Sequence, residues 1–534
     1  MKKWIPILVI TIIAIILISI FPRWTVDDAY IYFRYAENLA NHGDISWNIG
    51  ETPVEGYTGI FWLVLLAGAI KLGISPIITT HVLGIIGFAL GAIGLWTIFK
   101  QIKINYFGQY AALLLYTTTP LLYTHIFSGL ETTIFLGLIL ASMAVAINAI
   151  IKKNIPTTIS LFIVLLLTGL TRPEGVAFAG ILGLILLIFI YKQKKSYLKQ
   201  YIILGILFYI IPASLYMIWR INLYGYIFPN TYYAKELSGF QVSNITDMGR
   251  FFISYFAAPT VLGIFLLLPS LDSVFKKLKE KNLSRIIIIV TTLSLFSIAE
   301  IFQLSRSHLI VNYAYRLYMP ILPLFWVLFG ISVGVGFDAH KIYKKEEPLR
   351  YKASLLFIML LATYQLAFHT QKFRKEVKFV IEEELILQAE HVSVGKFLNK
   401  ELPQEEWLVS YIDAGAIPYY AKHKTLDFGN LNDSALAHEK KTELERIDYL
   451  FDKKPGAIVM TSIDKEIQNY GRESEAIISD KRFINYILVK KFISPIEKIK
   501  YHEFVYFRND LLKNKQEEDQ NDIVEEFEEN IVTR

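Results

Sequence analysis

The chain has 534 residues, of which 54% are hydrophobic and only 19% are charged. A soluble protein of this length would carry more charge and would not repeat long apolar runs. The formal net charge of +6 gathers in short Lys and Arg clusters, which excludes the continuous basic face of a nucleic-acid-binding protein. The absence of cysteine excludes disulfides and thiol chemistry.

The N-terminus carries Lys2 and Lys3 before an apolar run that ends at Phe21. A cleaved signal peptide is the alternative, but such peptides usually end in a small-x-small site, and residues 19–24 offer none. We therefore predict an uncleaved anchor helix with the two lysines on the cytoplasmic side of the membrane, where positive charge is favoured.

Further apolar segments recur along the chain, each long enough, or nearly so, to cross a bilayer. They predict a polytopic α-helical membrane protein with about 11 or 12 transmembrane helices. We expect these segments at residues 4–21, 57–73, 75–99, 107–124, 130–151, 156–170, 175–191, 201–220, 251–270, 285–303, 315–336 and 353–369.

Short basic clusters between the segments orient the helices, because Lys and Arg favour the cytoplasmic side. From residue 100 onward the clusters follow every second segment. If 57–73 and 75–99 both crossed the bilayer, Lys100 would lie outside, so we expect 57–73 to be re-entrant or interfacial. Five polar loops then share the extracytoplasmic face: 22–56, 125–130, 171–174, 221–250 and 304–314.

After about residue 370 the long apolar runs stop and the charge rises. Helix-like and strand-like stretches alternate there, which predicts a small α/β domain with a mostly parallel sheet. We expect a helix over 380–400 and strands at 407–411, 456–460, 486–489 and 504–507. The chain thus divides into a membrane module over 1–370, an extracytoplasmic α/β domain over 371–511 and an acidic, disordered tail over 512–534.

Two adjacent carboxylates, Asp27 and Asp28, follow the first apolar segment. Acidic residues at a bilayer edge are costly to desolvate, which makes them candidates for function. In a helix over 27–38, Asp27 and Arg34 share one face. One Asp could merely cap the helix and Arg34 could merely snorkel, but capping explains one carboxylate and not two. The pair predicts a catalytic or metal-binding site.

Aromatic and acidic residues follow before the next apolar segment: Trp47, Asn48, Glu55 and Tyr57. Aromatic residues at a membrane interface are commonly only belt residues. Proteins also hold sugars in this way, because rings stack on the apolar face of a sugar while acids bond its hydroxyls. Glu55 favours the second interpretation.

Glu131 and His125 lie between two apolar segments. Glu131 is as consistent with an acid that offsets a helix dipole as with a site residue. His125 alone is more often a hydrogen-bonded interfacial residue than a ligand.

Three cations lie in predicted loops of one face, namely Arg172, Lys235 and Arg316. A guanidinium at an outer membrane edge suits a lipid phosphate, which it can bind through two parallel hydrogen bonds. The alternatives are a local ion pair between Arg172 and Glu174 across Pro173, and a snorkelling anchor for any one cation alone. Taken together, the three predict an anion site.

In the predicted soluble domain, Asp413 follows the strand at 407–411 and precedes small residues. This is where α/β folds bind ligands. The chain has no GxGxxG, HExxH, GxSxG or Walker motif, so nucleotide binding, proteolysis, triad hydrolysis and ATP-driven transport lack support.

The chain resembles the GT-C class of polyprenyl-phosphate-dependent glycosyltransferases and is most similar to the mycobacterial terminal arabinofuranosyltransferases. The resemblance rests on DDAYIYFRYAENLANHGDISWN, PVEGYT, SGLE, TRPEG, PNTYYAK, YRLYMPILP and DAGAIPYY, which lie between residues 27 and 420. It implies a multi-helix membrane module with an extracytoplasmic active site, a soluble domain, a lipid-phosphate sugar donor and an inverting transfer. Asp27 or Asp28 matches the family's catalytic acidic position. The resemblance does not extend to the sugar, which in the mycobacterial relatives is a pentofuranose.

We therefore expect a multi-pass enzyme of the plasma (inner) membrane that moves a sugar from a polyprenyl-phosphate donor to a cell-envelope glycan or lipid acceptor. Asp27 or Asp28 would be the general base, and Arg172, Lys235 and Arg316 would bind the donor phosphate. Arg34 would bind the same phosphate or orient the aspartates. Paired carboxylates also bind hard cations, so a divalent metal is an open alternative. The residues expected to bind sugar or acceptor are Tyr30, Trp47, Asn48, Glu55, Tyr57, Glu131, Glu174, Asn230, Tyr232 and Asp413.

Two other classes fit a chain of this kind. A secondary transporter should place charges near the bilayer midplane on broken helices, whereas these charges crowd one predicted face. A non-catalytic protein of envelope-glycan assembly would use the soluble domain to bind a glycan or a partner. Loss of transfer in aspartate variants would separate the enzyme from both.

Overall fold

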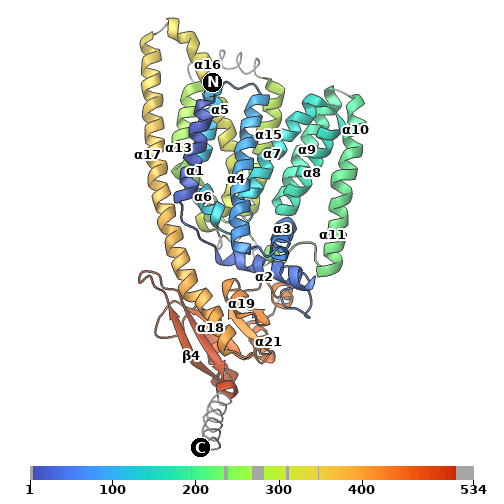
Figure 1. Ribbon diagram of the computed structural model, residues 1–534, viewed down its shortest axis with the longest axis vertical. Coiled ribbons are helices and arrows are strands. Elements are labelled where there is room, and N and C mark those ends of the chain that lie inside the picture. Colours follow the sequence, from blue (N-terminus) through green and yellow to red (C-terminus); the bar gives the residue numbers. More distant parts are fainter. Residues whose placement is uncertain are drawn as a thin grey trace, which may run out of the picture. The chain divides into compact units, whose positions relative to one another are not determined.

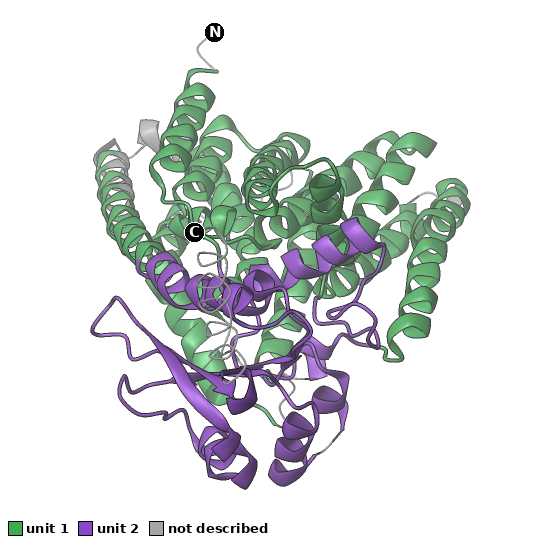
Figure 2. Cartoon of the chain, turned by 60° about the horizontal axis from the view of Figure 1, so that its bottom comes forward, with its two compact units in different colours: residues 1–25, 58–227, 235–381 green, residues 26–57, 228–234, 382–534 purple. Residues whose placement is uncertain are grey.

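The structure is a computed structural model that describes residues 4–193, 195–233, 239–267, 282–307, 309, 312–346, 348–439 and 441–512. Contacts between residues divide the chain into two compact units, which Figure 2 shows in different colours. Unit 1 consists of residues 1–25, 58–227 and 235–381. Unit 2 consists of residues 26–57, 228–234 and 382–534.

Unit 1 is built from helices, most of which run alongside one another (Figure 1). In the described residues, seven helical stretches are long and apolar enough to cross a membrane, which confirms the predicted polytopic α-helical fold. The helices are α1 Ile5–Ile20, α3 Ile60–Lys71, α4 Pro76–Gln101, α5 Tyr106–Thr118, α6 Pro120–Phe127, α7 Thr132–Lys152, α8 Ile155–Thr171, α9 Glu174–Gln193, α10 Lys195–Gly205, η1 Ile206–Ile210, α11 Ile211–Tyr224, α13 Val242–Leu267, α15 Leu283–Leu304, η2 Tyr313–Ile321, α16 Leu322–Glu346 and α17 Pro348–Leu387, whose last turns belong to unit 2.

The centre of unit 1 is α7, which packs closely on α4. Gly87 and Gly94 on α4 make this approach possible, because a Cβ atom at either would overlap the backbone of α7 at Ile134 or Leu140. Thr133 then donates its hydroxyl hydrogen to the carbonyl of Gly84 at 3.1 Å. Small residues have this role wherever helices meet in a membrane.

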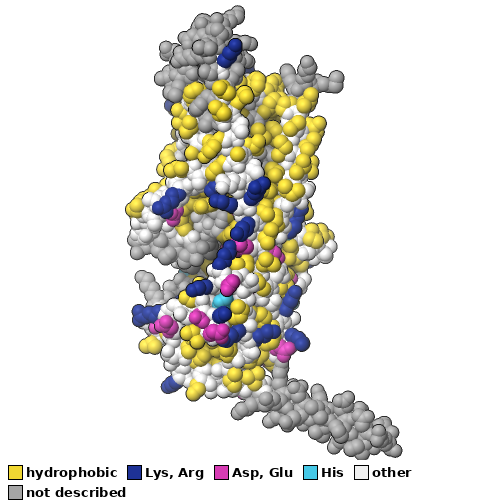
Figure 3. All heavy atoms as spheres, turned by 90° about the vertical axis from the view of Figure 1, so that its left-hand side faces the viewer, with side chains coloured by type: hydrophobic (Ala, Val, Ile, Leu, Met, Phe, Trp, Pro, Cys, Tyr) yellow, Lys and Arg dark blue, Asp and Glu magenta, His cyan; other side chains and the backbone are white. Residues whose placement is uncertain are grey.

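The outer helices of unit 1 expose apolar side chains. On the face in Figure 3, hydrophobic side chains gather over the helices of unit 1. Leu356, Met359 and Leu360 of α17 are examples, each more than half exposed. Such exposure would be costly in water and is expected where lipid surrounds the helices.

Two of the expected segments differ from a simple crossing helix. In the segment 57–73, α3 has only 12 residues. A helix of that length rises ~18 Å, less than the ~30 Å of a bilayer core, in agreement with the expectation that this segment is not a full crossing. The prediction of one helix over 107–124 is wrong, because the chain is extended at Thr119 and a new helix begins at Pro120. Proline lacks an N–H and disfavours helical backbone in the residue before it.

Unit 2 is an α/β unit to which the early segment 26–57 also belongs. Its first helix, α2, spans Asp27–His42, as expected from the sequence. The other elements are α12 Asn230–Tyr233, η3 Gln388–Val392, α18 Ser393–Glu401, β1 Leu408–Tyr411, α19 Ala416–Ala421, β2 Thr425–Asp427, α20 Ser434–His438, α21 Glu443–Asp452, β3 Ala457–Ser462, α22 Arg472–Ser479, η4 Lys481–Asn485, β4 Tyr486–Ile493 and β5 His502–Arg508.

The sheet has the strand order β2-β1-β3-β5-β4. All four predicted strands are present, but the expectation of a mostly parallel sheet is wrong. β1 pairs in parallel with β2 and β3, whereas β5 pairs antiparallel with both β3 and β4. The connection from β4 to β5 is too short for the crossover that a parallel pair needs.

Alternate residues of the strands enter two apolar cores. Val409, Ile458 and Phe504 pack in one, while Leu408 and Val459 pack in the other. Successive side chains of a strand point to opposite faces of its sheet, so the period of two in these strands produces both cores.

Candidate functional site

The two aspartates lie in the first turn of α2, where acidic side chains offset the helix dipole. The N-cap residue is Val26, and no side chain caps the helix. The alternative that one aspartate merely caps the helix is therefore not what this structure shows. Asp27 and Asp28 are both half-buried.

Asp27 is held by groups from the C-terminal part of unit 2. Its Oδ1 accepts a hydrogen bond from Nδ1–H of His391 at 2.9 Å and another from the N–H of Ala416 at 2.8 Å. Gly415 makes this approach possible, because a Cβ atom there would overlap the carboxylate of Asp27. Burial opposes the charged form of Asp27. The charge of His391 and hydrogen bonds from His391 and the backbone of Ala416 and Gly415 outweigh burial and lower the pKa of Asp27.

His391 lies in a one-turn π-helix, η3, an irregularity that is frequent at functional sites. Its Nε2 faces Oδ1 of Asp413 at 3.9 Å. Burial would favour the neutral ring, but the charges of Asp413, Asp27 and Glu503 raise the pKa of His391 well above its usual value. The imidazole thus lies between two carboxylates that are 386 residues apart in the chain, since 413 − 27 = 386.

Asp413 is placed by a strained turn after β1. Ile412 has φ +83°, which a β-branched residue rarely adopts. Oδ2 of Asp413 accepts hydrogen bonds from the hydroxyls of Tyr501 at 2.6 Å and Thr461 at 2.8 Å. Thr461 also lies 3.2 Å from Oε1 of Glu503. Burial, and then the charge of Asp413, raise the pKa of Glu503 well above its usual value.

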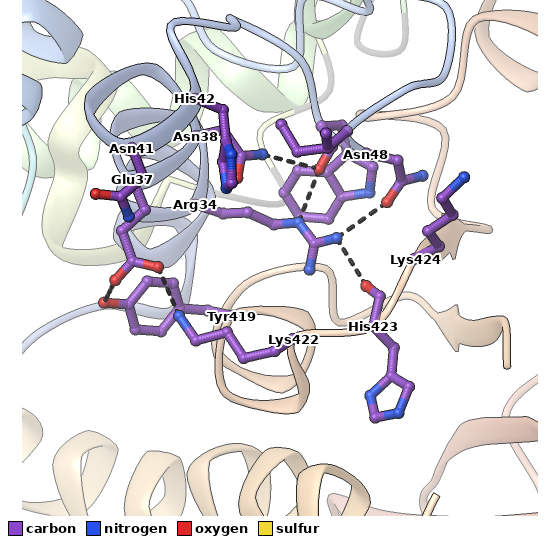
Figure 4. Close-up of a pocket in the computed structure, with 12 residues that line it drawn as sticks. Arg34, Glu37, Asn38, Asn41, His42, Asn48, Tyr419, Lys422, His423 and Lys424 are labelled. Atoms are coloured by element: carbon purple, nitrogen blue, oxygen red, sulfur yellow. Dashed lines mark hydrogen bonds and ion pairs between the residues drawn. The ribbon is translucent and has the colours of Figure 1, made fainter. Parts of the chain in front are cut away.

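Arg34 braces three segments of unit 2. It donates hydrogen bonds to the carbonyls of Trp47, Pro418 and His423 and to the side-chain oxygen of Asn48, at 2.7 to 2.9 Å. Figure 4 shows those to Asn48 and His423. Its guanidinium also covers the Trp47 ring at 4.5 Å. These bonds favour a structural role for Arg34 over the predicted binding of phosphate.

A polar pocket of about 390 Å³ adjoins Arg34 (Figure 4). At one side, Glu37 accepts hydrogen bonds from the hydroxyl of Tyr419 and the ammonium of Lys422, both at 2.5 Å. Amide, imidazole and ammonium groups make up most of the remaining wall. The full lining is Arg34, Glu37, Asn38, Asn41, His42, Trp47, Asn48, Ile49, Tyr419, Lys422, His423 and Lys424.

The predicted sugar-binding aromatic residues are mostly core residues here. Tyr30, Trp47 and Tyr57 are each about 1% exposed. Tyr30 packs on the ring of Tyr419, Tyr57 packs on the ring of Tyr35, and Trp47 lies beneath Arg34. Their burial leaves little ring surface for a sugar in this structure.

The segment 228–233 also belongs to unit 2. The backbone N–H of Asn230 donates to the carbonyl of Glu55 at 3.1 Å. The side-chain oxygen of Asn230 lies 2.7 Å from Nε2 of His438. Glu55 is buried, whereas Tyr232 is partly exposed and stacks on Phe228. The motifs around 27, 55, 230 and 413 thus belong to one unit, despite their separation in the sequence.

Unit 1 contains a second polar cluster, around Arg172. Its Nη1 donates to Glu131 at 2.7 Å, and its Nη2 donates to Glu174 at 2.9 Å. The local ion pair with Glu174 that the sequence offered as an alternative is therefore present, and Glu131 joins it. All three side chains are largely buried.

Arg316 lies near this cluster, after a strained turn. Ala314 and Tyr315 have φ values of +44° and +56°. The carbonyl of Ala314 lies 3.0 Å from Nε2 of His125. The charges of Arg172 and Arg316 both act on His125, so these two predicted cations converge within unit 1. Lys235, the third, lies outside the described residues.

The sequence analysis missed His391, Thr461, Tyr501 and Glu503. One signal could have revealed Glu503, because it is a carboxylate inside the apolar strand β5. His391 lies in a helix with many charged residues and carried no comparable signal.

Comparison with known proteins identifies the fold. Residues 381–511 match the model of a family described as a domain of unknown function (DUF8728). No curated protein matches the chain. The structure is similar to ArnT from Cupriavidus metallidurans in the apo state, with a TM-score of 0.56 and 12% identity over 95% of this chain and 98% of that one. For the same protein bound to undecaprenyl phosphate, the TM-score is 0.54, with 11% identity over 94% and 97% of the two chains.

The archaeal oligosaccharyltransferase from Archaeoglobus fulgidus, in its apo form, is also similar. Its TM-score is 0.54, with 14% identity over 86% of this chain and 70% of that one. These proteins are GT-C glycosyltransferases, so the chain has a GT-C fold. The finer resemblance to mycobacterial arabinofuranosyltransferases stays a prediction.

Proposed function

We propose that this protein is an integral membrane glycosyltransferase that moves a sugar from a polyprenyl-phosphate donor to a cell-envelope glycan or lipid. The observation that carries the proposal is a GT-C fold over nearly the whole chain, with an aspartate pair at the start of α2. A similar structure holds undecaprenyl phosphate, which supports a donor on an isoprenoid carrier.

The reaction needs a base for the acceptor hydroxyl. In our proposal the acceptor oxygen attacks the anomeric carbon, the bond from that carbon to the phosphate oxygen breaks, and the proton passes to an aspartate. Asp28 is the better candidate, because Oδ1 of Asp27 already accepts two hydrogen bonds and its lowered pKa makes it a weaker base. Asp27 would then position the start of α2. Attack on the face opposite the leaving group inverts the anomeric centre.

The departing polyprenyl phosphate carries developing negative charge, which a cation would stabilise. Arg172 and Arg316 are the described candidates in unit 1, and the charge of Arg172 is already offset by Glu131 and Glu174. Arg172 would set the field around Arg316 and His125. The sugar could be a pentofuranose, as in the family that the sequence resembles.

The polar pocket beside Arg34 is our candidate for holding part of the acceptor. Its walls carry amide groups and both signs of charge, which suit the hydroxyls of a glycan. Asn38 and Asn48 bond within the protein, whereas Asn41 and His42 are exposed at the pocket. The acceptor would therefore contact Asn41 and His42 first.

Transfer by the purified full chain, supplied with a panel of polyprenyl-phosphate sugars and envelope glycans, tests the proposal. Asp28→Asn should lower kcat at least about 100-fold, since a general base typically contributes 10²–10⁴-fold. Asp452→Asn, at the exposed end of α21, is the matched control and should transfer normally. Equal turnover of Asp28→Asn and the unchanged chain would refute the assignment of the base.

A second variant tests the phosphate role of Arg316. Arg316→Gln should raise the KM for the donor more than the KM for the acceptor. If only the KM for the acceptor rose, Arg316 would not bind the donor phosphate.

A further inference from the structure

A buried ring nitrogen in unit 2 has no hydrogen-bond partner. It is Nε2 of His391, a residue that is only 6% exposed. The other ring nitrogen, Nδ1, bonds to the carboxylate of Asp27. An ionised carboxylate can only accept, so Nδ1 carries a hydrogen. Without another ligand the nearby acids favour a second proton on Nε2, and once that proton leaves, Nε2 presents a lone pair. A buried polar atom without a hydrogen-bond partner costs free energy in either protonation state, and a metal ion that replaced the proton at Nε2 would remove that cost.

A carboxylate oxygen faces Nε2. Asp413 places Oδ1 at 3.9 Å from Nε2, too far for a hydrogen bond. Two ligands of one metal ion, each bonded at ~2.1 Å, lie ~3.0 to 4.2 Å apart, a range that includes this separation. Asp27, His391 and Asp413 each offer a ligand atom within 4.8 Å of the others. Glu503, which is fully buried, has an oxygen, Oε2, without a partner.

We propose that His391 and Asp413 bind a divalent metal ion, with Asp27 orienting the histidine and Glu503 supplying a further oxygen. A carboxylate that accepts a hydrogen bond from the far nitrogen of a metal-bound histidine fixes the ring and its tautomer. Asp27 has that position here. A divalent cation would also balance the acids that meet around one imidazole.

The mixture of one nitrogen and several oxygen ligands indicates the kind of metal. Imidazole suits zinc and similar transition metals, whereas carboxylates also suit manganese. A site with both is better matched to Mn²⁺ or Zn²⁺ than to Ca²⁺, which prefers oxygen alone. The inference concerns only residues of unit 2 and does not depend on the proposed transfer reaction.

Irregular backbone holds both proposed metal ligands in place. His391 lies on a π-turn, and Asp413 follows a β-branched residue in the left-handed region. Both irregularities cost free energy and persist where surrounding structure enforces them. Hydroxyls from Tyr501 and Thr461 fix the outer oxygen of Asp413, which leaves its inner oxygen facing His391.

Binding of Mn²⁺ to the detergent-purified full chain, after treatment with a chelator, tests the inference. Electron paramagnetic resonance follows the loss of the free Mn²⁺ signal, and competition with Zn²⁺, Mg²⁺ and Ca²⁺ ranks the metals. His391→Asn keeps a donor near the position of Nδ1 but has no atom at Nε2. Asp413→Asn can keep its carbonyl oxygen toward Tyr501 and Thr461 while an amide replaces Oδ1. Each should weaken Mn²⁺ binding at least about tenfold.

Asp452→Asn is the control and should bind Mn²⁺ as the unchanged chain does. Absence of Mn²⁺ and Zn²⁺ binding by the unchanged chain would overturn the inference. So would Mn²⁺ binding by both site variants that is as tight as binding by the unchanged chain. A proton shared between His391 and Asp413 would then explain the cluster. If the variants do not fold, nitrogen coupling to Mn²⁺ bound at one site of the unchanged chain supports the inference, because it requires a nitrogen ligand, and its absence would overturn the inference. These readouts measure binding, so a failure of the proposed transferase activity would not affect them.

Discussion

Among the described residues, each unit buries a basic side chain between carboxylates, but the two bases differ in chemistry. In unit 1, Arg172 pairs with Glu131 and Glu174. In unit 2, His391 lies between Asp27 and Asp413. A guanidinium keeps its charge at any accessible pH, so the unit 1 cluster has one fixed charge state. An imidazole can lose its proton and present a lone pair, so the unit 2 cluster can exchange a proton for another ligand.

The difference shows that similar composition does not mean similar function. A buried arginine paired with two acids stabilises the fold only while all three charges are present, because removal of one leaves another buried without compensation. A buried histidine with several acids can change its state without moving its backbone. The predictions below test how far this contrast holds.

The largest expected effect is in unit 1. Arg172→Met leaves Glu131 and Glu174 buried without their cation, which should lower the free energy of unfolding by about 3–5 kcal/mol. Thermal or denaturant unfolding of the detergent-purified protein measures it. Arg172→Lys retains the charge and should cost less. A loss of under 1 kcal/mol for Arg172→Met would show that these three charges do not stabilise the fold together.

Substitution of Arg34 tests whether a guanidinium also stabilises the fold in unit 2. Arg34→Lys keeps the charge but cannot reach all four oxygen acceptors, so unfolding should require about 2–3 kcal/mol less. The same unfolding assay applies. The exposed Lys400, replaced by Arg, is the control and should change little. Equal stability of Arg34→Lys and the unchanged chain would contradict the bracing role.

Gly415 tests whether the close approach of the backbone to Asp27 stabilises unit 2. A Cβ atom there would overlap Asp27, so Gly415→Ala should cost about 1–3 kcal/mol and displace the carboxylate from His391. Gly249→Ala, where the added Cβ would meet nothing within 4 Å, is the matched control. If both substitutions had the same small effect, the close approach of Asp27 would not be needed for stability.

The last prediction concerns pH dependence and a buried acid outside both clusters. Burial raises the pKa of Asp427 to about 6 despite hydrogen bonds from Asn432 and Gly429. Its usual value is 3.8, so the folded state holds this proton more tightly. The resulting contribution to stability is present below about pH 4 and is lost as pH rises to about 6. Unfolding temperatures at pH 4, 5, 6 and 7 should fall less for Asp427→Asn than for the unchanged chain. Parallel slopes would contradict the shift.

Much of the framework was predictable from local patterns. Apolar runs predicted most of the helices of unit 1, because bilayer thickness fixes a minimum length of apolar sequence. The four main strands followed from runs of β-branched and aromatic residues. The three-residue strand β2 was not foreseen, because Thr425–Asp427 is too short for a periodic signal and is stabilised by pairing with β1.

The candidate sites were predicted in part, because their residues stood out only where polarity was unexpected. Asp27 and Asp413 were identified singly, as acids in unusual surroundings. That they share His391 could not be derived, since the contact depends on tertiary packing across hundreds of residues. The pairing of Arg172 with Glu131 has the same character. The ion pair with Glu174, two residues away, was within reach of the sequence.

The discontinuous make-up of unit 2 has a consequence for biosynthesis. Arg34 donates a hydrogen bond to the carbonyl of His423, which lies 389 residues later in the chain. At a translation rate of about 5–20 residues per second, α2 is made about 20–80 s before that partner emerges. During this interval its buried aromatic face has no native neighbour from the later segment. Newborn chains should therefore depend on the lipid headgroup region or a chaperone to shelter α2 until the last strands are complete.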